Sequence, residues 1–148
     1  MWLVQGDLLD EQIGIIVHGV NAQGKFNAGF ARQLRAKYPQ TYEDYMAHYR
    51  AHGLHLGQVI LTVVHPRLIV ASGVTQQYYG RDPNVVYVNY EAIARVFEQI
   101  KPLAIHSDLP VKFPEIGCGL ANGDWTAVQN VIDSVLLPEV DPILYRQK

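Results

Sequence analysis

The segment from Ile13 to Val20 constrains the fold of this chain more than any other, because it is a near-continuous run of β-branched residues. Such a run is typical of a strand that is buried on both faces, which indicates an α/β protein. A loop rich in small residues follows at 21–29, and apolar residues then recur at helical spacing over 30–38 and stop at Pro39. The sequence therefore predicts a buried strand that leads through a loop into a helix.

The rest of the chain alternates between strand-like and helix-like segments. We expect further strands at residues 2–5, 58–64, 68–74, 103–106, 111–116 and 142–145, and helices at 40–52, from Asp82 to 101 and from about Asp124 onward. No repeat, low-complexity segment or linker interrupts this order. The pattern predicts an α/β fold in one domain, residues 1–148, with an open mixed sheet of about six strands between helices.

Composition and charge exclude several classes of protein. The 12 basic and 14 acidic residues give a net charge of −2 without any basic run, so duplex nucleic acid is not an expected partner. Cys118 is the single cysteine, which excludes an intramolecular disulfide and fits a reducing compartment. The first residues lack the pattern of a signal peptide, and no apolar stretch approaches the roughly 20 residues that span a bilayer. We expect a cytoplasmic monomer without membrane contact.

Two loops of small residues are the main indication of function. The second loop, Gly117 to Gly123, stands between a strand-like segment and a helix, as the first loop at 21–29 does. Glycines let a ligand approach the backbone closely, and a helix N-terminus adds partial positive charge, so such a loop can hold phosphate without a lysine. Ligands of open α/β sheets bind beyond the carboxyl ends of the strands. A tight turn explains one such loop equally well, but two of them indicate one site for a diphosphate.

Several polar residues beside these loops have both a structural and a functional interpretation. His18 is either a neutral, hydrogen-bonded core residue, or a general acid, general base or phosphate donor at the edge of the site. Asn21 can donate to and accept from a ribose hydroxyl or a water molecule. Asp7 is either a turn former or a ligand contact, and Asp124 is either a helix cap or an activator of water. Cys118 has no arginine beside its loop, which argues against a nucleophilic cysteine.

Three segments together resemble the macro domain family. They are Gly6 to Leu9 (GDLL), His18 to Pro39 (HGVNAQGKFNAGFARQLRAKYP) and Phe113 to Trp125 (FPEIGCGLANGDW). The resemblance extends along nearly the whole chain, and it is closest to the small stand-alone ADP-ribose-1″-phosphate phosphatases within the family. It implies a three-layer α/β/α domain with a central mixed sheet. It also implies a site for ADP-ribose or ADP-ribose 1″-phosphate, and the sequence calls for no metal and no cofactor.

The resemblance implies a role for each part of the site. Asp7 and Leu8 would lie near the adenine, with the carboxylate accepting from the exocyclic amine. The distal ribose and one phosphate would be held by Asn21, Ala22, Gln23, Gly24 and Gly29, with Gln76 as a further contact. The diphosphate would receive backbone N–H groups from Gly117, Cys118, Gly119 and Leu120. His18 would match a histidine implicated in the phosphatases.

Two positions depart from the glycohydrolase members of the family. Their nucleophilic lysine is replaced by Gln76, which forms no covalent adduct with a sugar aldehyde, and their acid after the GCGL motif is replaced by Ala121. We therefore predict hydrolysis of ADP-ribose 1″-phosphate to ADP-ribose and phosphate. His18 would assist proton transfer, Asn21 would orient water or the ribose, and Asp124 is a candidate for activating water. The alternatives are a hydrolase that removes ADP-ribose from macromolecules and a non-catalytic reader of ADP-ribose.

Overall fold

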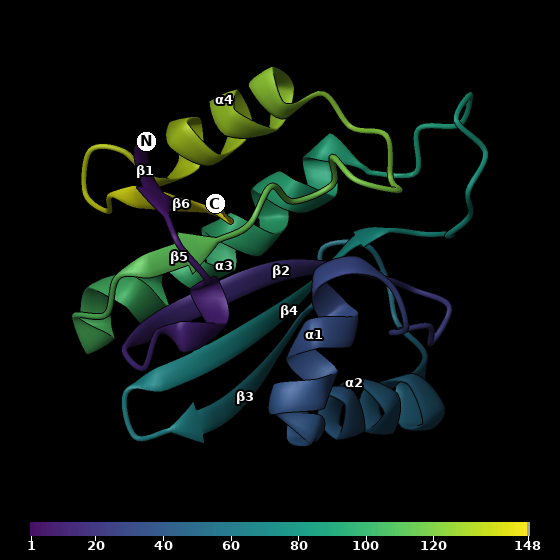
Figure 1. Cartoon of the computed structure of the whole chain (residues 1–148), viewed down its shortest axis with the longest axis horizontal. Helices are drawn as coiled ribbons and strands as arrows, with labels where there is room; N and C mark the ends of the chain where they lie inside the picture. The colour runs from purple at the N-terminus through teal and green to yellow at the C-terminus, as the bar shows by residue number, and fades with distance from the viewer. Residues whose placement is uncertain (148) are drawn as a thin grey trace.

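Six strands form one sheet in the computed structural model, which describes residues 1–147. They are β1 (Trp2–Gln5), β2 (Gly14–Asn21), β3 (Val59–His65), β4 (Leu68–Gln76), β5 (Val111–Phe113) and β6 (Pro142–Arg146). Their order across the sheet is β1-β6-β5-β2-β4-β3. Neighbouring strands are parallel except β3, which runs antiparallel to β4 (Figure 1). The sheet is therefore mixed, as predicted.

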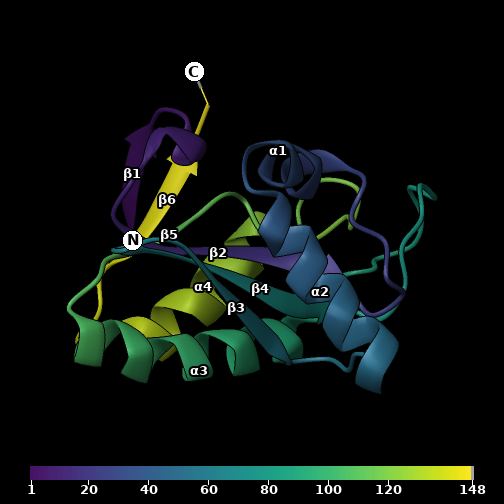
Figure 2. The same cartoon turned by 90° about the horizontal axis from the view of Figure 1, so that it is seen from below.

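Four α-helices in the same part of the chain cover the two faces of the sheet. They are α1 (Gly29–Lys37), α2 (Pro39–His52), α3 (Tyr90–Ser107) and α4 (Trp125–Leu136), and a short 3-10 helix, η1 (Leu8–Asp10), follows β1. Figure 2 shows α1 and α2 on one side of the sheet and α3 and α4 on the other. This confirms the predicted three-layer α/β/α fold. None of the helices within residues 1–147 combines the length and the apolar character of a bilayer span.

The central strand β2 supplies side chains to both cores. Ile15 and Val17 belong to the core under α3 and α4, whereas Ile16 and Val20 belong to the core under α1 and α2. Alternate residues of a strand point to opposite faces, so the β-branched run fills both cores at once. Burial of each such side chain contributes about 1.5–3 kcal/mol. This packing fixes the carboxyl end of β2, from which the first glycine-containing loop begins.

The helix expected from Asp82 begins only at Tyr90, so this prediction was wrong. The reason is the cap of α3, where the Asn89 side chain accepts from the N–H of Ala92 at 2.9 Å. Residues 82–88 form a loop instead, and Val88 at its end is buried and bridged to β4. The loop between β4 and α3 is consequently long and lies beside the first glycine-containing loop.

The strand expected at 103–106 is also wrong, because α3 continues to Ser107 through Pro102. Ala104 extends the apolar face of the helix and is 3% exposed, so packing outweighs the hydrogen bond that a proline cannot donate. The strand expected at 111–116 ends at Phe113. Pro114 follows, and it cannot donate to a strand ladder. Residues 114–116 instead lead into the second glycine-rich loop.

Candidate functional site

Two adjoining cavities lie beyond the carboxyl ends of the parallel strands. The larger has a volume of about 810 Å³ and is lined by the loops that follow β2, β4 and β5. The smaller, of about 380 Å³, lies beside the carboxyl ends of β1 and β6. Both cavities are lined by Phe30, Pro114 and Glu115. The two therefore form one groove with a small end and a large end.

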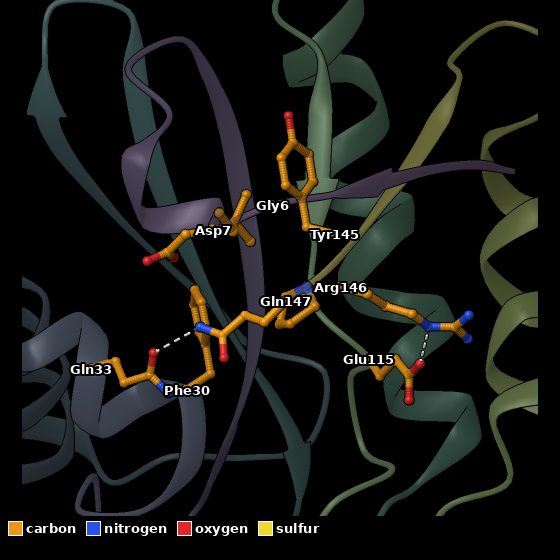
Figure 3. Close-up of a pocket in the computed structure, with 10 residues that line it drawn as sticks. Gly6, Asp7, Phe30, Gln33, Glu115, Tyr145, Arg146 and Gln147 are labelled. Carbon is orange, nitrogen blue, oxygen red and sulfur yellow. Dashed lines mark hydrogen bonds and ion pairs between the residues drawn. The ribbon is translucent and has the colours of Figure 1, made fainter.

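The small end is built from three separate parts of the chain (Figure 3). Asp7 comes from the turn after β1, Phe30 from α1, and Tyr145 from the end of β6. One carboxylate oxygen of Asp7 accepts from the N–H of Leu9 at 2.9 Å and so caps η1. The second oxygen accepts no hydrogen bond within residues 1–147. An acceptor together with the aromatic ring of Phe30 suits a flat base that carries an exocyclic amine.

Asn21 organises the loop after β2, which forms one wall of the large end. Its Oδ1 accepts from the N–H groups of Gln23 and Lys25 at 3.0 and 3.3 Å, and its Nδ2 donates to the Lys25 carbonyl at 2.8 Å. The hydroxyl of Tyr45 donates to the Asn21 carbonyl at 2.5 Å. Burial raises the pKa of Tyr45, which keeps this hydroxyl protonated as a donor. Asn21 lines the cavity, but most of its hydrogen bonds shape the loop itself.

The loop after β5 forms the opposite wall and depends on glycine at two positions. Gly117 has a φ of 76°, and a Cβ there would lie 2.6 Å from a methyl carbon of Val88. The N–H of Gly123 donates to the Gly117 carbonyl at 2.7 Å, which closes the loop just before α4. Gly117, Gly119 and Leu120 line the large end. Because Gly117 and Gly119 carry no side chain, a ligand in the cavity can approach their backbone closely, as a phosphate cradle requires.

His18 stands in the wall of the large end, but it is 1% exposed. Its ring packs against Phe26 and Phe30, with centroids 5.5 and 5.8 Å away, and its Nε2 lies 2.7 Å from the Oγ of Ser72. Burial lowers the pKa of His18 to about 3, so the imidazole is neutral at physiological pH. A group with this pKa is a weak general base and carries no proton to donate as an imidazolium. The geometry favours the core interpretation over the role in proton transfer.

Five of the expected site residues do not line either cavity. They are Ala22, Gln23, Gly24, Cys118 and Asp124. Asp124 caps α4 by accepting from the N–H of Thr126 at 3.1 Å, so its position supports the helix-cap interpretation and not the activation of water. Burial, with the nearby charges of Glu115 and Asp124, raises the pKa of Cys118 to about 11. Cys118 is a protonated thiol, consistent with the argument against a nucleophilic cysteine.

The other expected residues do line the groove. Asp7 and Leu8 lie at the small end, and the large end receives His18, Asn21, Gly29, Gln76, Gly117, Gly119 and Leu120. Sequence reasoning missed other lining residues, namely Phe30, Thr75, Arg81 and Glu115. Phe30 is one of the apolar residues at helical spacing in the segment 30–38, and this spacing predicts a packing role rather than a ligand contact. Arg81 immediately precedes the segment that was expected to be helical, so nothing in the pattern placed it at a cavity.

The fold and the groove define a three-layer α/β/α protein with a ligand site at the carboxyl ends of its parallel strands. No family model matches the chain. An ADP-ribose 1″-phosphate phosphatase from Scheffersomyces stipitis is 24% identical in an alignment that covers 87% of this chain and 91% of the relative. A macrodomain protein from Streptomyces coelicolor is 27% identical, with a TM-score of 0.84 over 99% of both chains. DarTG of Thermosipho africanus, solved in complex with ADP-ribose, has a TM-score of 0.79 at 18% identity over 99% of this chain and 41% of its own. The chain therefore has the fold of macrodomain proteins and is similar to them along nearly its whole length.

Proposed function

We propose that this protein binds ADP-ribose 1″-phosphate in the groove and hydrolyses it to ADP-ribose and inorganic phosphate. The observation that carries the proposal is the division of the groove into a small end with an aromatic ring and a carboxylate, and a large end with two glycine-containing loops. An elongated ligand with a base at one end and phosphates farther along fits this division. The Scheffersomyces stipitis phosphatase and the ADP-ribose complex of DarTG support the same ligand and reaction.

Each part of the ligand has a matching part of the groove. The adenine would lie at the small end, where the free oxygen of Asp7 accepts from its exocyclic amine. The diphosphate would lie along the backbone of Gly117 and Gly119, at the start of the segment that leads into α4. The distal ribose would lie beside the loop that Asn21 holds in shape. Backbone N–H groups can bind these phosphates without lysine or arginine.

The hydrolysis transfers a phosphoryl group to water. The oxygen of water bonds to phosphorus, the bond between phosphorus and the ribose oxygen breaks, and a proton passes to the departing hydroxyl. Within residues 1–147, Glu115 is the single carboxylate that lines the large end, and Arg146 pairs with it. The chain would therefore act by holding the phosphate and water in line and by directing fixed dipoles at the phosphate, which suits phosphoryl transfer.

Two alternatives remain as outcomes of experiment. A hydrolase of protein-linked ADP-ribose that uses a lysine nucleophile is disfavoured, because Gln76 lines the cavity and its Nε2 donates to the Tyr78 carbonyl at 2.7 Å. A non-catalytic reader is favoured by one observation, the low pKa of His18, which removes the expected acid or base from the site. The reader needs only the groove.

Phosphorus NMR of ADP-ribose 1″-phosphate with a small amount of protein tests the proposal. We expect a growing signal of inorganic phosphate while the diphosphate signals remain intact. The matched blocked variant is Gly119→Val, because a Cβ at Gly119 meets no atom within 4 Å and the residue lines the large end. This variant should stay folded and lose turnover. Exchange-broadened diphosphate signals without any phosphate release would instead indicate a reader.

A further inference from the structure

Two cations of the large end have no anionic partner within residues 1–147. Lys25 lines the cavity from the loop after β2, and Arg81 lines it from the loop after β4. Neither forms an ion pair with a carboxylate of residues 1–147. Glu115, the carboxylate that lines the same cavity, is paired with Arg146. The large end therefore carries positive charge that the described part of the chain does not neutralise.

The backbone on the C-terminal side of Arg81 is held in place from two directions. The N–H of Asp82 donates to the hydroxyl of Tyr87 at 3.3 Å. The side chain of Asn122, in the loop after β5, donates to the carbonyls of Asp82 and Val85 at 2.9 and 2.7 Å. Since these bonds position the neighbour of Arg81, the guanidinium projects from a fixed point of the loop and not from a free chain.

The backbone of Lys25 is fixed in a similar way, because both its N–H and its carbonyl bond to the side chain of Asn21. The two loops are also tied together, since Nε2 of Gln23 donates to the carbonyl of Gln77 at 3.0 Å. A backbone that is held in place before a ligand arrives loses less conformational freedom on binding. The two cations therefore line one cavity from loops whose backbone is already ordered.

This pair lies away from the end of the groove that suits a base. Arg81 and Lys25 line only the large end, and the residues common to both ends lie elsewhere. Figures 1 and 2 show the teal loop between β4 and α3, which carries Arg81, on the far side of the molecule from β1 and β6. A ligand whose base lies beside β1 and β6 would extend its opposite terminus toward this loop.

We propose that Arg81 and Lys25 bind the terminal phosphate of ADP-ribose 1″-phosphate and so select this ligand over ADP-ribose. The inference rests on the proposed function. Because backbone N–H groups of the loop after β5 can bind the diphosphate, the two cations, which are unpaired within residues 1–147, are available for a further anionic group. A guanidinium binds two phosphate oxygens at once through parallel hydrogen bonds, whereas an ammonium acts as a point charge. Arg81 is therefore the main determinant, and Lys25 adds a weaker attraction.

Calorimetry with two ligands that are not turned over tests the selection. One is ADP-ribose, and the other is a phosphonate analogue of ADP-ribose 1″-phosphate in which a methylene group replaces the scissile oxygen. The wild-type protein should bind the phosphonate about tenfold or more tightly than ADP-ribose at low salt, since charged hydrogen bonds of this kind are strong. Raising the salt concentration should reduce this ratio, because both cations are exposed.

Three variants show which cation is responsible for the selection. They are Arg81→Gln and Lys25→Gln, with Arg67→Gln as the control. Arg67 lies in the turn between β3 and β4, at the opposite end of β4 from the cavity, so its substitution removes the same charge without touching the groove. We expect Arg81→Gln to reduce the ratio to about twofold or less, since it removes the bidentate contact. Its affinity for ADP-ribose should match that of the Arg67→Gln control.

The outcomes separate the two proposals. If the wild-type protein does not bind ADP-ribose, the proposed function itself fails. If ADP-ribose binds and the ratio is the same in all four proteins, the groove is correct and the selection by Arg81 and Lys25 is wrong. If Arg81→Gln weakens both ligands equally, Arg81 serves the diphosphate, and the assignment to the terminal phosphate is wrong.

Discussion

Nε2 of His18 lies 2.7 Å from the Oγ of Ser72, its register partner on the neighbouring strand, and both residues are 1% exposed. The other ring nitrogen, Nδ1, has no hydrogen-bond partner within residues 1–147. The ring belongs to the packed layer between β2 and α1, at the wall of the cavity. A histidine in this setting supports the loops above it and contributes to the pH dependence of stability.

The stability of the protein should fall as the pH is lowered through the range of a free histidine. Burial lowers the pKa of His18 from 6.5 to about 3. The unfolded chain therefore binds a proton below pH 6.5, where the folded chain does not, so the contribution of His18 to stability is complete above pH 6.5 and is lost toward pH 3. The expected slope is about 1.4 kcal/mol per pH unit.

Urea denaturation at pH 7 and pH 5 measures this loss. The variant His18→Gln can still bond to Ser72 but does not titrate, so its stability should change less over the same interval. The control is His65→Gln, which replaces an exposed histidine of β3 and should keep the wild-type slope. Equal slopes in the wild type and His18→Gln would show that His18 is protonated in the folded protein, which would return it to the list of acid–base candidates.

Substitutions of Asp124 distinguish a helix cap from a catalytic acid, because asparagine can replace aspartate as a cap but not as an acid. The carboxylate accepts from the N–H of Thr126, and asparagine can accept in the same way. We expect Asp124→Asn to retain both stability and turnover. Asp124→Ala should lose about 1 kcal/mol of stability while it retains turnover. Phosphate release measured for both variants is the test, and loss of turnover in a stable Asp124→Asn protein would make the side chain catalytic.

Gly117 and Gly119 stand in the same loop but should respond differently to alanine. Gly117 has a positive φ and a Cβ there would meet Val88 at 2.6 Å, so Gly117→Ala should destabilise the fold by about 1–3 kcal/mol. At Gly119 a Cβ meets no atom within 4 Å, so Gly119→Ala should change stability by no more than about 0.5 kcal/mol. Thermal or urea unfolding of the two variants measures these losses of stability. Equal losses would mean that the loop does not have the conformation described.

Local sequence patterns predicted the fold correctly where each pattern has a single physical explanation. The β-branched run of β2 must be buried on both sides, and the glycines after β2 and β5 mark loops that face the carboxyl ends of the strands. The prediction was wrong where tertiary contacts decide. Asp82 and Pro83 are typical of a helix start, but the cap at Asn89 and the bridge from Val88 to β4 delay the helix until Tyr90.

The position of the groove could be predicted from the sequence, but the role of each residue within it could not. The two glycine-containing loops fix where phosphates can bind, which follows from local backbone chemistry. The burial of His18 and the cap formed by Asp124 depend on neighbours distant in the sequence or on the exact end of a helix. Arg81 reaches the cavity only because the loop before α3 is long and is tied to the loop after β5. A contact of this kind between distant loops leaves no periodic pattern in the sequence from which it could be predicted.

Asn122 should control how firmly the loop between β4 and α3 is held against the groove. Its side chain makes two hydrogen bonds to that loop, and its own φ is 59°, a conformation that asparagine and glycine tolerate. The variant Asn122→Gly therefore removes the two bonds without straining the backbone. Each bond contributes about 0.5–1.5 kcal/mol, so local opening should become roughly tenfold more frequent.

Hydrogen exchange followed by mass spectrometry detects this opening. Amides from 79 to 87 should exchange faster in Asn122→Gly, including that of Tyr87, which donates to the Ala121 carbonyl at 2.9 Å. Amides of β2 should keep their protection, because both cores remain intact. Since Arg81 would then project from a mobile loop, affinity for the phosphonate analogue should fall more than affinity for ADP-ribose. Unchanged exchange at 79–87 would mean that other contacts hold the loop, and Asn122 would then have no part in placing Arg81.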